Sequence, residues 1–509
     1  MNHLVAIPFL LPAVTACALV ALSGRPALQR ALSVTSALVL CLAVLRLALQ
    51  VRGGVVEVYA YGAWPAHLGI VFVADRLAAL MLVVAAAVAL PALFHACGGA
   101  DRQGRHFHAL FHFQWMGLNG AFLTGDLFNL FVCFELMLIA SYALLQHGGG
   151  AQRLKAGMQY VTVNLVASAL FLIAASLIYR AGGTLNMADL AVRLGDAGSD
   201  DLPWIRAGVW LLAVVFLLKG AAAPLYLWLP GTYGAATGPV AALFAVLTKV
   251  GPYALLRVTG TAFPSVDAGG ILLEVVLVAG LITAVVAALG AISARTLTAL
   301  AAWLGLGSSA SMLVAVGLFN ETATGGGLFY VLPGTLGVAA MLLLADSIRA
   351  ARGDAGDELT RAPRMRDHAV LGALYFGIAV AVAGMPPFAG FLGKAMLLSG
   401  TPTVFPVWPV ILGASLVNMI ALARAGSRLF WAVDPDLAGG SARHVHPVAP
   451  ALLLAFILIA TAGAGRLESF ARGAAEGAIG PARYIAEVLG PERLRWMIRI
   501  DPSSTEGGR

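Results

Sequence analysis

The sequence predicts an all-α, polytopic membrane protein with about 14 transmembrane helices. Sixty per cent of its 509 residues are hydrophobic and 11% are charged, whereas a soluble domain carries about 25% charged residues. The mean hydropathy is +0.88, and apolar stretches recur along the whole chain. So few charges could not cover the surface of a soluble multidomain enzyme, and so much hydrophobicity excludes a disordered chain.

A membrane-spanning helix needs about 20 mainly apolar residues, and the chain contains a series of such segments. The first could be mistaken for a signal peptide, but it has no basic n-region and further apolar segments follow it. We therefore expect it to be the first membrane helix. In order, the segments lie near residues 4–22, 31–49, 70–95, 107–124, 127–145, 159–179, 206–228, 238–258, 270–292, 298–318, 326–345, 368–400, 408–431 and 448–464.

Segments seven and twelve contain helix breakers. Segment seven runs into Pro224 and Pro230, and segment twelve, which is too long for one straight helix, contains the run GMPP at 384–387. Broken helices persist inside membranes only where protein or a water-filled cavity satisfies the freed backbone groups. The sequence therefore predicts two discontinuous helices, each beside a polar interior.

The basic residues of the loops predict the orientation of the chain, because loops rich in Lys and Arg remain cytoplasmic. With the N-terminus outside, the outer loops hold only Arg52, Arg180, Arg193, Arg206 and Arg257. The cytoplasmic loops then hold Arg25, Arg30, Arg102, Arg105, Arg153, Lys155, Arg295, Arg349, Arg352, Arg361, Arg364, Arg366, Arg424, Arg428 and Arg443. Both ends of the chain are therefore expected on the outer side. The tail after about residue 465, which includes Trp496, is either an interfacial amphipathic helix or a partly ordered segment.

Three acidic residues lie at segment ends and have simple structural interpretations. Asp126 is expected to be the N-cap of segment five. Asp75 and Arg76 are expected to pair at the membrane interface. Asp346 ends segment eleven beside predicted cytoplasmic arginines, where we expect it to be solvated.

The cysteines and histidines do not predict a cofactor. His106, His108 and His112 cluster where segment four begins, and His108 and His112 are spaced to share a metal. The sequence places no carboxylate or thiolate with them, so interfacial histidines are the favoured interpretation. The cysteines lie in or beside apolar runs without a CxxC pair, so neither a cluster, a zinc site nor a disulfide framework is expected. They are Cys17, Cys41, Cys97 and Cys133.

Charged residues inside the apolar segments are the strongest functional signal. Of the four lysines, Lys219, Lys249 and Lys394 lie within such segments, as does Glu135. A charge at the bilayer centre costs about 2.5–3.5 kcal/mol on insertion scales. An ion pair that fixes helix packing would explain one such residue, but four of them favour proton handling. A buried lysine can lose its proton near neutral pH, whereas arginine effectively cannot.

Three long runs around these charges identify a family. The runs GDLFNLFVCFELMLIASYALL, LLKGAAAPLYLWLPGTYGAATGPVAALFAVLTKVGPYALLR and AGMPPFAGFLGKAMLLSG resemble the proton-conducting antiporter-like family. That family includes large membrane subunits of respiratory complex I, of energy-converting hydrogenases and of Mrp sodium/proton antiporters. The resemblance covers segments three to thirteen and is closest to the MrpD/PhaD type of Mrp antiporter subunit, with further support from DRLAALMLV and GLFYVLPGTLGVAAMLLLAD.

The resemblance implies a fold and a set of site residues. Two inverted five-helix repeats, at 106–258 and 259–431, would follow N-terminal helices at 1–105 and precede a last helix and amphipathic tail at 432–509. The broken helices would be segments seven and twelve. The proton-translocating residues would be Glu135, its partner Lys219, the central Lys249 and the exit residue Lys394.

The resemblance also implies partners, location and activity. The chain would be a non-enzymatic subunit of a hetero-oligomer with other Mrp-type subunits in the bacterial inner membrane, exchanging protons for Na⁺ or another monovalent cation. No cofactor and no nucleic acid are implied. The alternative is a proton-pumping subunit of a complex I-like NADH:quinone oxidoreductase or membrane hydrogenase. A scaffold or an inorganic-carbon uptake subunit is a third possibility, although the retained acid and lysines argue against a pure scaffold.

Two departures from the family pattern suggest a divergent paralogue. Tyr226 stands where related subunits tend to have histidine, and Pro333 and Gly334 stand in a run that usually reads YLVHST. The second change removes a titratable group from segment eleven and adds a helix breaker. The region 295–309 is also looser than the family's usual basic–aromatic–serine pattern.

Overall fold

The computed structural model describes residues 2–66, 68–195, 200–263, 271–363, 365, 367–432 and 447–490. The described chain is built almost wholly of α-helices, which confirms the predicted all-α class. An antiparallel hairpin joins β1 (Glu57–Ala60) and β2 (Val71–Ala74). The helices are α1 (Ile7–Ala21), α2 (Pro26–Val51), α3 (Arg76–Ala96), α4 (Phe107–Leu123), α5 (Leu127–Leu145), α6 (Ala151–Gly182), α7 (Met187–Gly195), α8 (Leu202–Lys219), α9 (Trp228–Ala235), α10 (Gly238–Arg257), α11 (Ile271–Ser293), α12 (Leu297–Leu318), α13 (Glu321–Arg352), α14 (His368–Ala383), α15 (Ala389–Ser399), α16 (Val407–Gly426), α17 (Val448–Ala462), α18 (Ala464–Ile479) and α19 (Ala482–Leu489).

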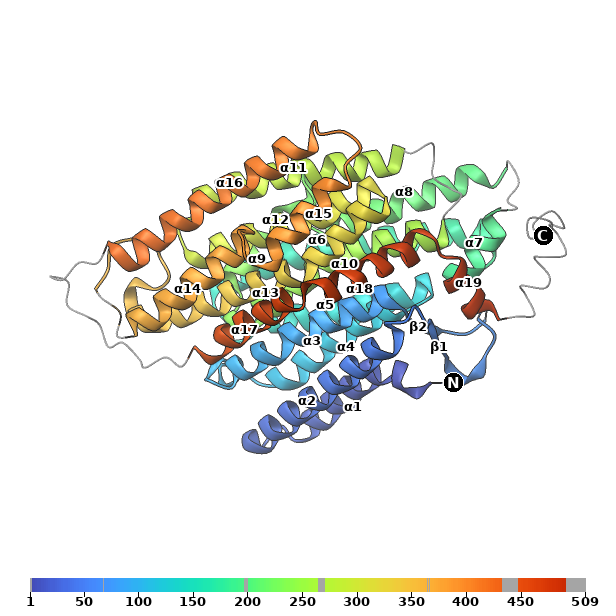
Figure 1. The fold of residues 1–509 in the computed structure, drawn as a ribbon. Coiled ribbons are helices and arrows are strands. Elements are labelled where there is room, and N and C mark those ends of the chain that lie inside the picture. The colour runs from blue at the N-terminus through green and yellow to red at the C-terminus, as the bar shows by residue number, and fades with distance from the viewer. Residues whose placement is uncertain are drawn as a thin grey trace.

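The long helices lie side by side along one axis, and the N-terminus, the hairpin, α7 and α19 share one end of the bundle (Figure 1). Ten helices of the described chain are long and apolar enough to cross a membrane, and α17 with α18, bent by 82°, forms an eleventh candidate. The predicted number of about 14 is not confirmed. Segments one, four, twelve and fourteen form helices that are shorter or bent: α1, α4, the pair α14 and α15, and the pair α17 and α18.

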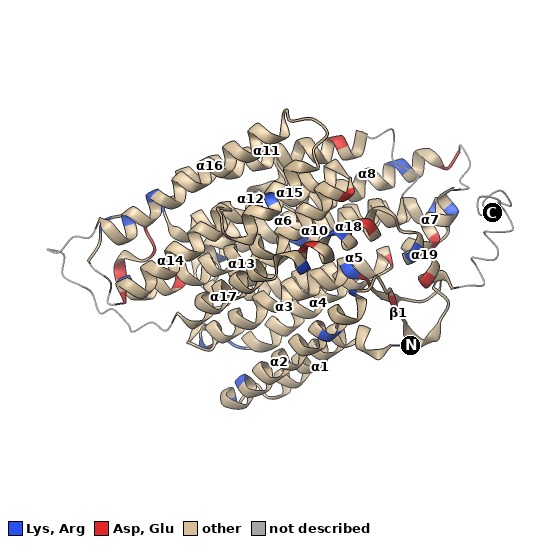
Figure 2. Cartoon of the chain, viewed as in Figure 1, with Lys and Arg blue, Asp and Glu red and all other residues tan. Residues whose placement is uncertain are grey.

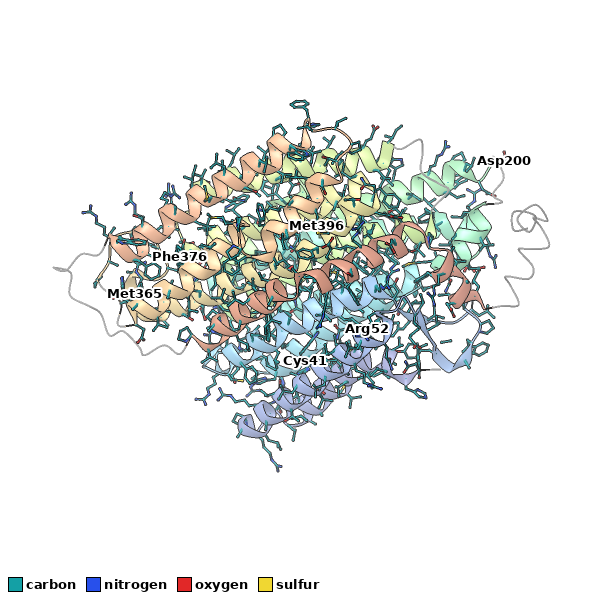
Figure 3. The ribbon with its side chains drawn as sticks, in the orientation of Figure 1. Cys41, Arg52, Asp200, Met365, Phe376 and Met396 are labelled. Atoms are coloured by element: carbon teal, nitrogen blue, oxygen red, sulfur yellow. The ribbon has the colours of Figure 1, made fainter. Side chains whose placement is uncertain are left out.

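The outside of the bundle is apolar. Leu42 is 68% exposed and Phe376 is 69% exposed, and Phe376 points outward in Figure 3. Charged residues gather mainly at the two ends of the bundle (Figure 2). Such an apolar surface suits contact with lipid chains, so the chain is a multi-pass membrane protein.

Acidic residues begin two of the helices. The carboxylate of Asp126 accepts a hydrogen bond from the backbone of Asn129, which confirms the predicted N-cap of α5. Asp75 caps α3 in the same way. Its predicted pairing with Arg76 is wrong, because the carboxylate forms two 2.6 Å contacts with the guanidinium of Arg257 on α10. The guanidinium of Arg76 instead donates to the backbone carbonyl of Arg52.

The end of α8 lies against α10 because of a glycine. A Cβ atom at Gly251 would lie 2.3 Å from the backbone nitrogen of Gly220 and 2.3 Å from the backbone oxygen of Phe216. Real side chains do not make such contacts with backbone atoms. Gly251 therefore sets the separation of α8 and α10, which carry Lys219 and Lys249.

Alanine in place of Gly251 is expected to destabilise the protein by about 1–3 kcal/mol, because α8 and α10 must separate to admit the methyl group. The thermal midpoint of the detergent-solubilised chain measures this change. Gly234→Ala is the matched control, since nothing lies within 4 Å of a Cβ atom there. Equal midpoints for the two variants would contradict the close contact.

The C-terminal part is helical up to the last described residues. α18 packs against α3 and α13. The predicted amphipathic helix therefore packs the face that carries its small buried residues against other helices of the protein. These residues are Ala471, Gly473, Ala474, Ala475 and Ala478.

Some sequence predictions lie outside these observations. Trp496 and the loop residues Arg364, Arg366 and Arg443 fall outside the described residues. The division of the chain at residues 105, 258 and 431 stays a prediction.

Candidate functional site

Both predicted breaks are present, and each has a lysine at or beside the C-terminal end of a half-helix. α8 ends at Lys219, and α9 begins only after a short non-α segment. Segment twelve divides into α14 and α15, and the ammonium of Lys394 on α15 donates a 3.1 Å hydrogen bond to the carbonyl of Ala383, the last residue of α14. The carbonyl end of a helix carries partial negative charge. Each lysine therefore lies where a positive charge is favoured.

Glu135 and Lys219 are connected through two polar side chains of α6. The hydroxyl of Ser168 donates to the carboxylate of Glu135, and the ammonium of Lys219 donates to the side-chain oxygen of Asn164 at 3.1 Å. The hydroxyl oxygen of Ser168 also lies 3.0 Å from the backbone carbonyl oxygen of Asn164. Among the described residues Glu135 and Lys219 make no direct ion pair, so these two predicted partners are bridged by Ser168 and Asn164.

Lys249 lies in the middle of α10, a helix whose residues are all buried. Its side chain is 1% exposed, and its ammonium donates to the hydroxyl of Thr248 at 3.3 Å. Thr248 in turn donates to the carbonyl of Ala245 at 3.1 Å. Within the described part of the chain, the ammonium of the central lysine is therefore held in the core by one weak polar contact.

Lys394 lines a small polar cavity. Its ammonium donates to the hydroxyl of Ser415 at 3.0 Å and lies 5.7 Å from the ring centre of Tyr330. The cavity has a volume of about 20 Å³, and its wall also includes Ser308 and Asn418. A space of this size with several polar groups can hold about one water molecule.

Two adjacent serines of α12 connect this cavity with the central lysine. The hydroxyl of Ser309 donates to the carbonyl of Gly220 at 2.7 Å and lies 3.3 Å from that of Thr248. Ser308 lines the cavity of Lys394. Polar groups thus extend from the end of α8, past Lys249, to Lys394.

The departures from the family pattern have structural explanations. A Cβ atom at Gly334 would lie 2.9 Å from the hydroxyl of Ser308 and 2.9 Å from the ring of Tyr330, so these groups occupy the space of a larger side chain. Pro333 does not break its helix, because α13 continues from Glu321 to Arg352. The ring of Tyr226 packs 5.8 Å from that of Trp303, centre to centre.

The structure buries Lys219 and Lys249 and leaves Glu135 and Lys394 half-buried, and it adds polar partners that were not predicted. The signal for them was a polar pair spaced by one helical turn within an apolar segment: Asn164 with Ser168, and Ser415 with Asn418.

The histidine cluster has a carboxylate and a thiol beside it, which corrects the sequence-based expectation. Cys97, Asp101 and His108 could together hold a metal ion. However, Asp101 already binds the guanidinium of Arg30 at 2.6 and 2.7 Å and His108 at 3.2 Å. Burial also raises the pKa of the Cys97 thiol, which disfavours the thiolate. We therefore interpret the cluster as a structural network.

Other contacts agree with that interpretation. The hydroxyl of Ser33 bridges Nδ1 of His108 and Nε2 of His112, each at 3.0 Å, so the two histidines do not face a shared metal. Burial would raise the pKa of Asp101, but its hydrogen bonds from Arg30 and His108 outweigh burial and lower that pKa. Asp101 is therefore a carboxylate at neutral pH, as the network requires.

Comparison with known proteins extends these observations to nearly the whole chain. The pattern of the family described as "NADH:quinone oxidoreductase/Mrp antiporter, TM" matches residues 124–419. The chain is 38% identical to the D-type subunit of a "Probable K(+)/H(+) antiporter" of Rhizobium meliloti, over 97% of this chain and 98% of the relative. It is 32% identical to the D-type subunit of a "Na(+)/H(+) antiporter" of Alkalihalophilus pseudofirmus, over 96% of this chain and all of the relative.

A solved structure agrees with the fold. A chain of the Mrp complex from Dietzia sp. DQ12-45-1b superposes with a TM-score of 0.86 at 26% sequence identity, over 96% of this chain and all of that one. Sequence and fold thus agree from the N-terminal helices to the last described ones. The protein belongs to the NADH:quinone oxidoreductase/Mrp antiporter family of membrane subunits, and within it to the MrpD type.

Proposed function

We propose that the chain is the proton-translocating subunit of a multisubunit monovalent cation/proton antiporter. The observation that carries this proposal is the series of three lysines and one glutamate held by polar side chains inside an apolar bundle. The relatives named as D-type antiporter subunits support it. The subunit would work with other Mrp-type subunits in the bacterial inner membrane, with both termini outside, and would carry out no enzymatic reaction of its own.

The four residues have different roles in this proposal. Glu135 stabilises the protonated form of Lys219 through Ser168 and Asn164, and separation of the bridge favours proton release. The proton passes to Lys249 and then, past the serines of α12, to Lys394. A change of charge at one site biases the next, because the interior has a low dielectric constant.

A redox-driven proton pump is the second candidate, because the family description covers NADH:quinone oxidoreductases as well. In that case the chain would move protons while partner subunits carried out the redox steps. Genes for small Mrp-like membrane subunits beside this one favour antiport. Genes for quinone-site or hydrogenase subunits favour the redox complex.

The proposal predicts that antiport requires this chain together with its partners. Everted vesicles from cells that lack their own antiporters would carry the chain alone, the neighbouring subunits alone, or both. Recovery of fluorescence from a pH-sensitive dye after addition of Na⁺, K⁺ or Li⁺ measures proton movement. Only the full set should respond. Because the two relatives are named for different cations, both Na⁺ and K⁺ must be tested. Full activity from the neighbours without this chain would contradict the proposal.

A further inference from the structure

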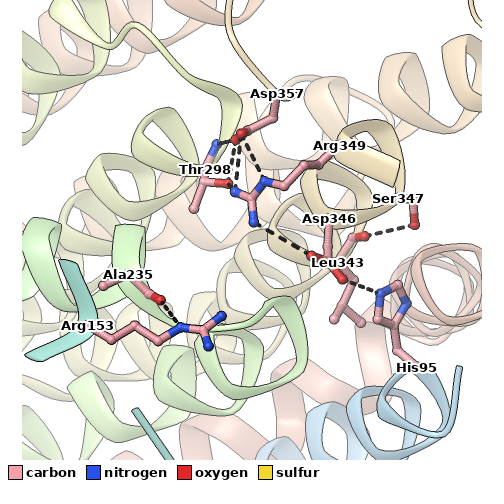
Figure 4. Close-up of polar contacts among 9 residues, drawn as sticks. All are labelled: His95, Arg153, Ala235, Thr298, Leu343, Asp346, Ser347, Arg349 and Asp357. Carbon is pink, nitrogen blue, oxygen red and sulfur yellow. Dashed lines mark hydrogen bonds and ion pairs between the residues drawn. The ribbon is translucent and has the colours of Figure 1, made fainter. Parts of the chain in front are cut away.

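A histidine–aspartate pair outside the four proposed residues joins two helices at one end of the bundle. Nε2 of His95, in the last turn of α3, lies 3.0 Å from a carboxylate oxygen of Asp346 on α13 (Figure 4). The side chain of His95 is 14% exposed and that of Asp346 is 29% exposed. The expectation that Asp346 is simply solvated is therefore wrong. The pair lies between the solvent and the core.

Two arginines face the pair, and both are held by other groups. Arg349 donates to Asp357 at 3.1 and 3.2 Å and lies 3.7 Å from Asp346. Arg153 of α6 is the other cation that faces Asp346. It donates to the carbonyls of Ala235 at 3.0 Å and His147 at 2.6 Å. Arginine keeps its proton near neutral pH. Of these four side chains, the imidazole of His95 and the carboxylate of Asp346 are therefore the two that can bind and release a proton.

The pair lies against the first turn of the helix that carries Lys249. A Cβ atom at Gly238, the first residue of α10, would lie 2.6 Å from Cβ of Asp346 and 3.0 Å from its carboxylate. Only glycine permits this contact. Lys249 follows on the same helix about three turns later, which is about 16 Å. The carboxylate of Asp346 thus lies beside the first turn of α10, and Lys249 lies about three turns further along the same helix.

The interface of α10 and α13 has a polar group at each of these levels. Thr237 occupies the N-cap position of α10 beside Gly238, but its side chain makes no capping hydrogen bond. Thr335 lies about three turns before Asp346 on α13, so it faces the same way as Asp346. The start of α10 lies beside the late part of α13, at Gly238 and Asp346, whereas Gly260, just after α10, lies near Phe319, just before α13. The two helices are therefore antiparallel, which places Thr335 at about the level of Lys249. Within the described chain both threonine hydroxyls are buried without a hydrogen-bond partner.

Buried hydroxyls without protein partners are usually satisfied by water. The α10 face between the two levels carries the small residues Ala242 and Ala245, both fully or almost fully buried. The polar groups therefore mark the two ends of the α10–α13 interface between Asp346 and Lys249, where water would join them.

We propose that His95 and Asp346 form the proton-exchange site through which Lys249 communicates with the predicted cytoplasmic side. A proton from water binds the pair, passes along water at the α10–α13 interface to the neutral amine of Lys249, and leaves the pair ready for the next proton. This inference rests on the proposed function. It also supplies a route past Pro333, where the family pattern would place a titratable side chain.

The test is proton uptake from the cytoplasmic face. Everted vesicles that contain the assembled complex are loaded with Na⁺ or K⁺ and diluted into cation-free medium, and acidification of the lumen is followed with a fluorescent dye. The variants are His95→Gln, Asp346→Asn and Asp346→Glu. His108→Gln is the matched control, because His108 on α4 also pairs with an aspartate, Asp101, but contacts Ser33 of α2 instead of α10 or α13. Co-purification of the partner subunits reports assembly.

The inference predicts an effect that depends on pH. At about pH 8.5, where protons are scarce, His95→Gln and Asp346→Asn should slow uptake on the order of tenfold. At about pH 6.5 the loss should be less than about twofold, since other groups can then deliver protons. Asp346→Glu should restore most of the rate, and His108→Gln should match the native complex.

Two results would overturn the inference. One is a native rate for both His95→Gln and Asp346→Asn at every pH. The other is an equal loss at all pH values without rescue by Asp346→Glu, which would show that the pair only ties α3 to α13. Lys249→Met separates the two proposals. If either of these two results is obtained and the Lys249→Met complex transports no protons, the proposed function stands and only this inference fails. Native transport by Lys249→Met would instead contradict the proposed function.

Discussion

Methionine in place of Lys249 is expected to abolish antiport by the assembled complex, with a rate at least about a hundredfold below the native one. Methionine fills a similar volume but binds no proton. Lys249 lies in the middle of the wholly buried α10, between the two broken helices, so its loss interrupts the series. Antiport in everted vesicles, normalised to the amount of assembled complex, measures the effect.

The same change is expected to leave the complex as stable as before or more stable. A charge in the membrane interior costs about 2.5–3.5 kcal/mol, and the ammonium of Lys249 recovers little of that cost from its 3.3 Å contact with Thr248. Loss of transport together with an unchanged or higher thermal midpoint would distinguish a functional lysine from a structural one.

Arginine at position 249 is the critical control. Lys249→Arg keeps the positive charge but cannot release a proton near neutral pH, so it should be as inactive as Lys249→Met. Lys155→Met provides the matched surface control, because Lys155 is exposed at the start of α6. Native transport by an assembled Lys249→Arg complex would show that only the charge matters, which would contradict the proposed proton transfer.

Glu135 and Lys219 are expected to behave as one functional unit. Glu135→Gln and Lys219→Met should each lower antiport about a hundredfold, and the double variant should be no more than about threefold worse than either single variant. The reason is that Ser168 and Asn164 connect the two groups. Once one of the two groups is neutral, neutralising the other lowers antiport little further.

The bridge itself can be tested in the same assay. Asn164→Leu removes the side-chain oxygen that accepts from Lys219 and should lower antiport about tenfold. Glu274→Gln is the matched acidic control, since Glu274 is exposed near the start of α11. Losses that multiply in the Glu135→Gln, Lys219→Met double variant, or native activity of Asn164→Leu, would contradict a bridged unit.

The features that depend on local composition could be predicted from the sequence. The membrane class follows from apolar runs, and the breaks in segments seven and twelve follow from proline and glycine, because these residues act on the backbone where they stand. The buried lysines stood out because a charge in an apolar run has an unfavourable cost that needs a compensating role.

The features that depend on contacts between distant segments could not be predicted. Asp75 was assigned to its neighbour Arg76, but it binds Arg257 on another helix. Asp346 was assigned to solvent, but it binds His95. Pro333 was expected to break a helix, yet α13 continues through it. For both aspartates the deciding partner lies far along the chain.

Composition and motifs alone identify a multi-pass membrane protein of the antiporter-like family, with two broken helices and four charged residues in its apolar segments. How those charges are satisfied emerges only from the packed fold: Glu135 and Lys219 through α6, Lys249 beside Thr248, and Lys394 in a small polar cavity. The physical reason is that hydropathy is a property of each segment, whereas a hydrogen bond between helices depends on their register and rotation, which packing alone establishes.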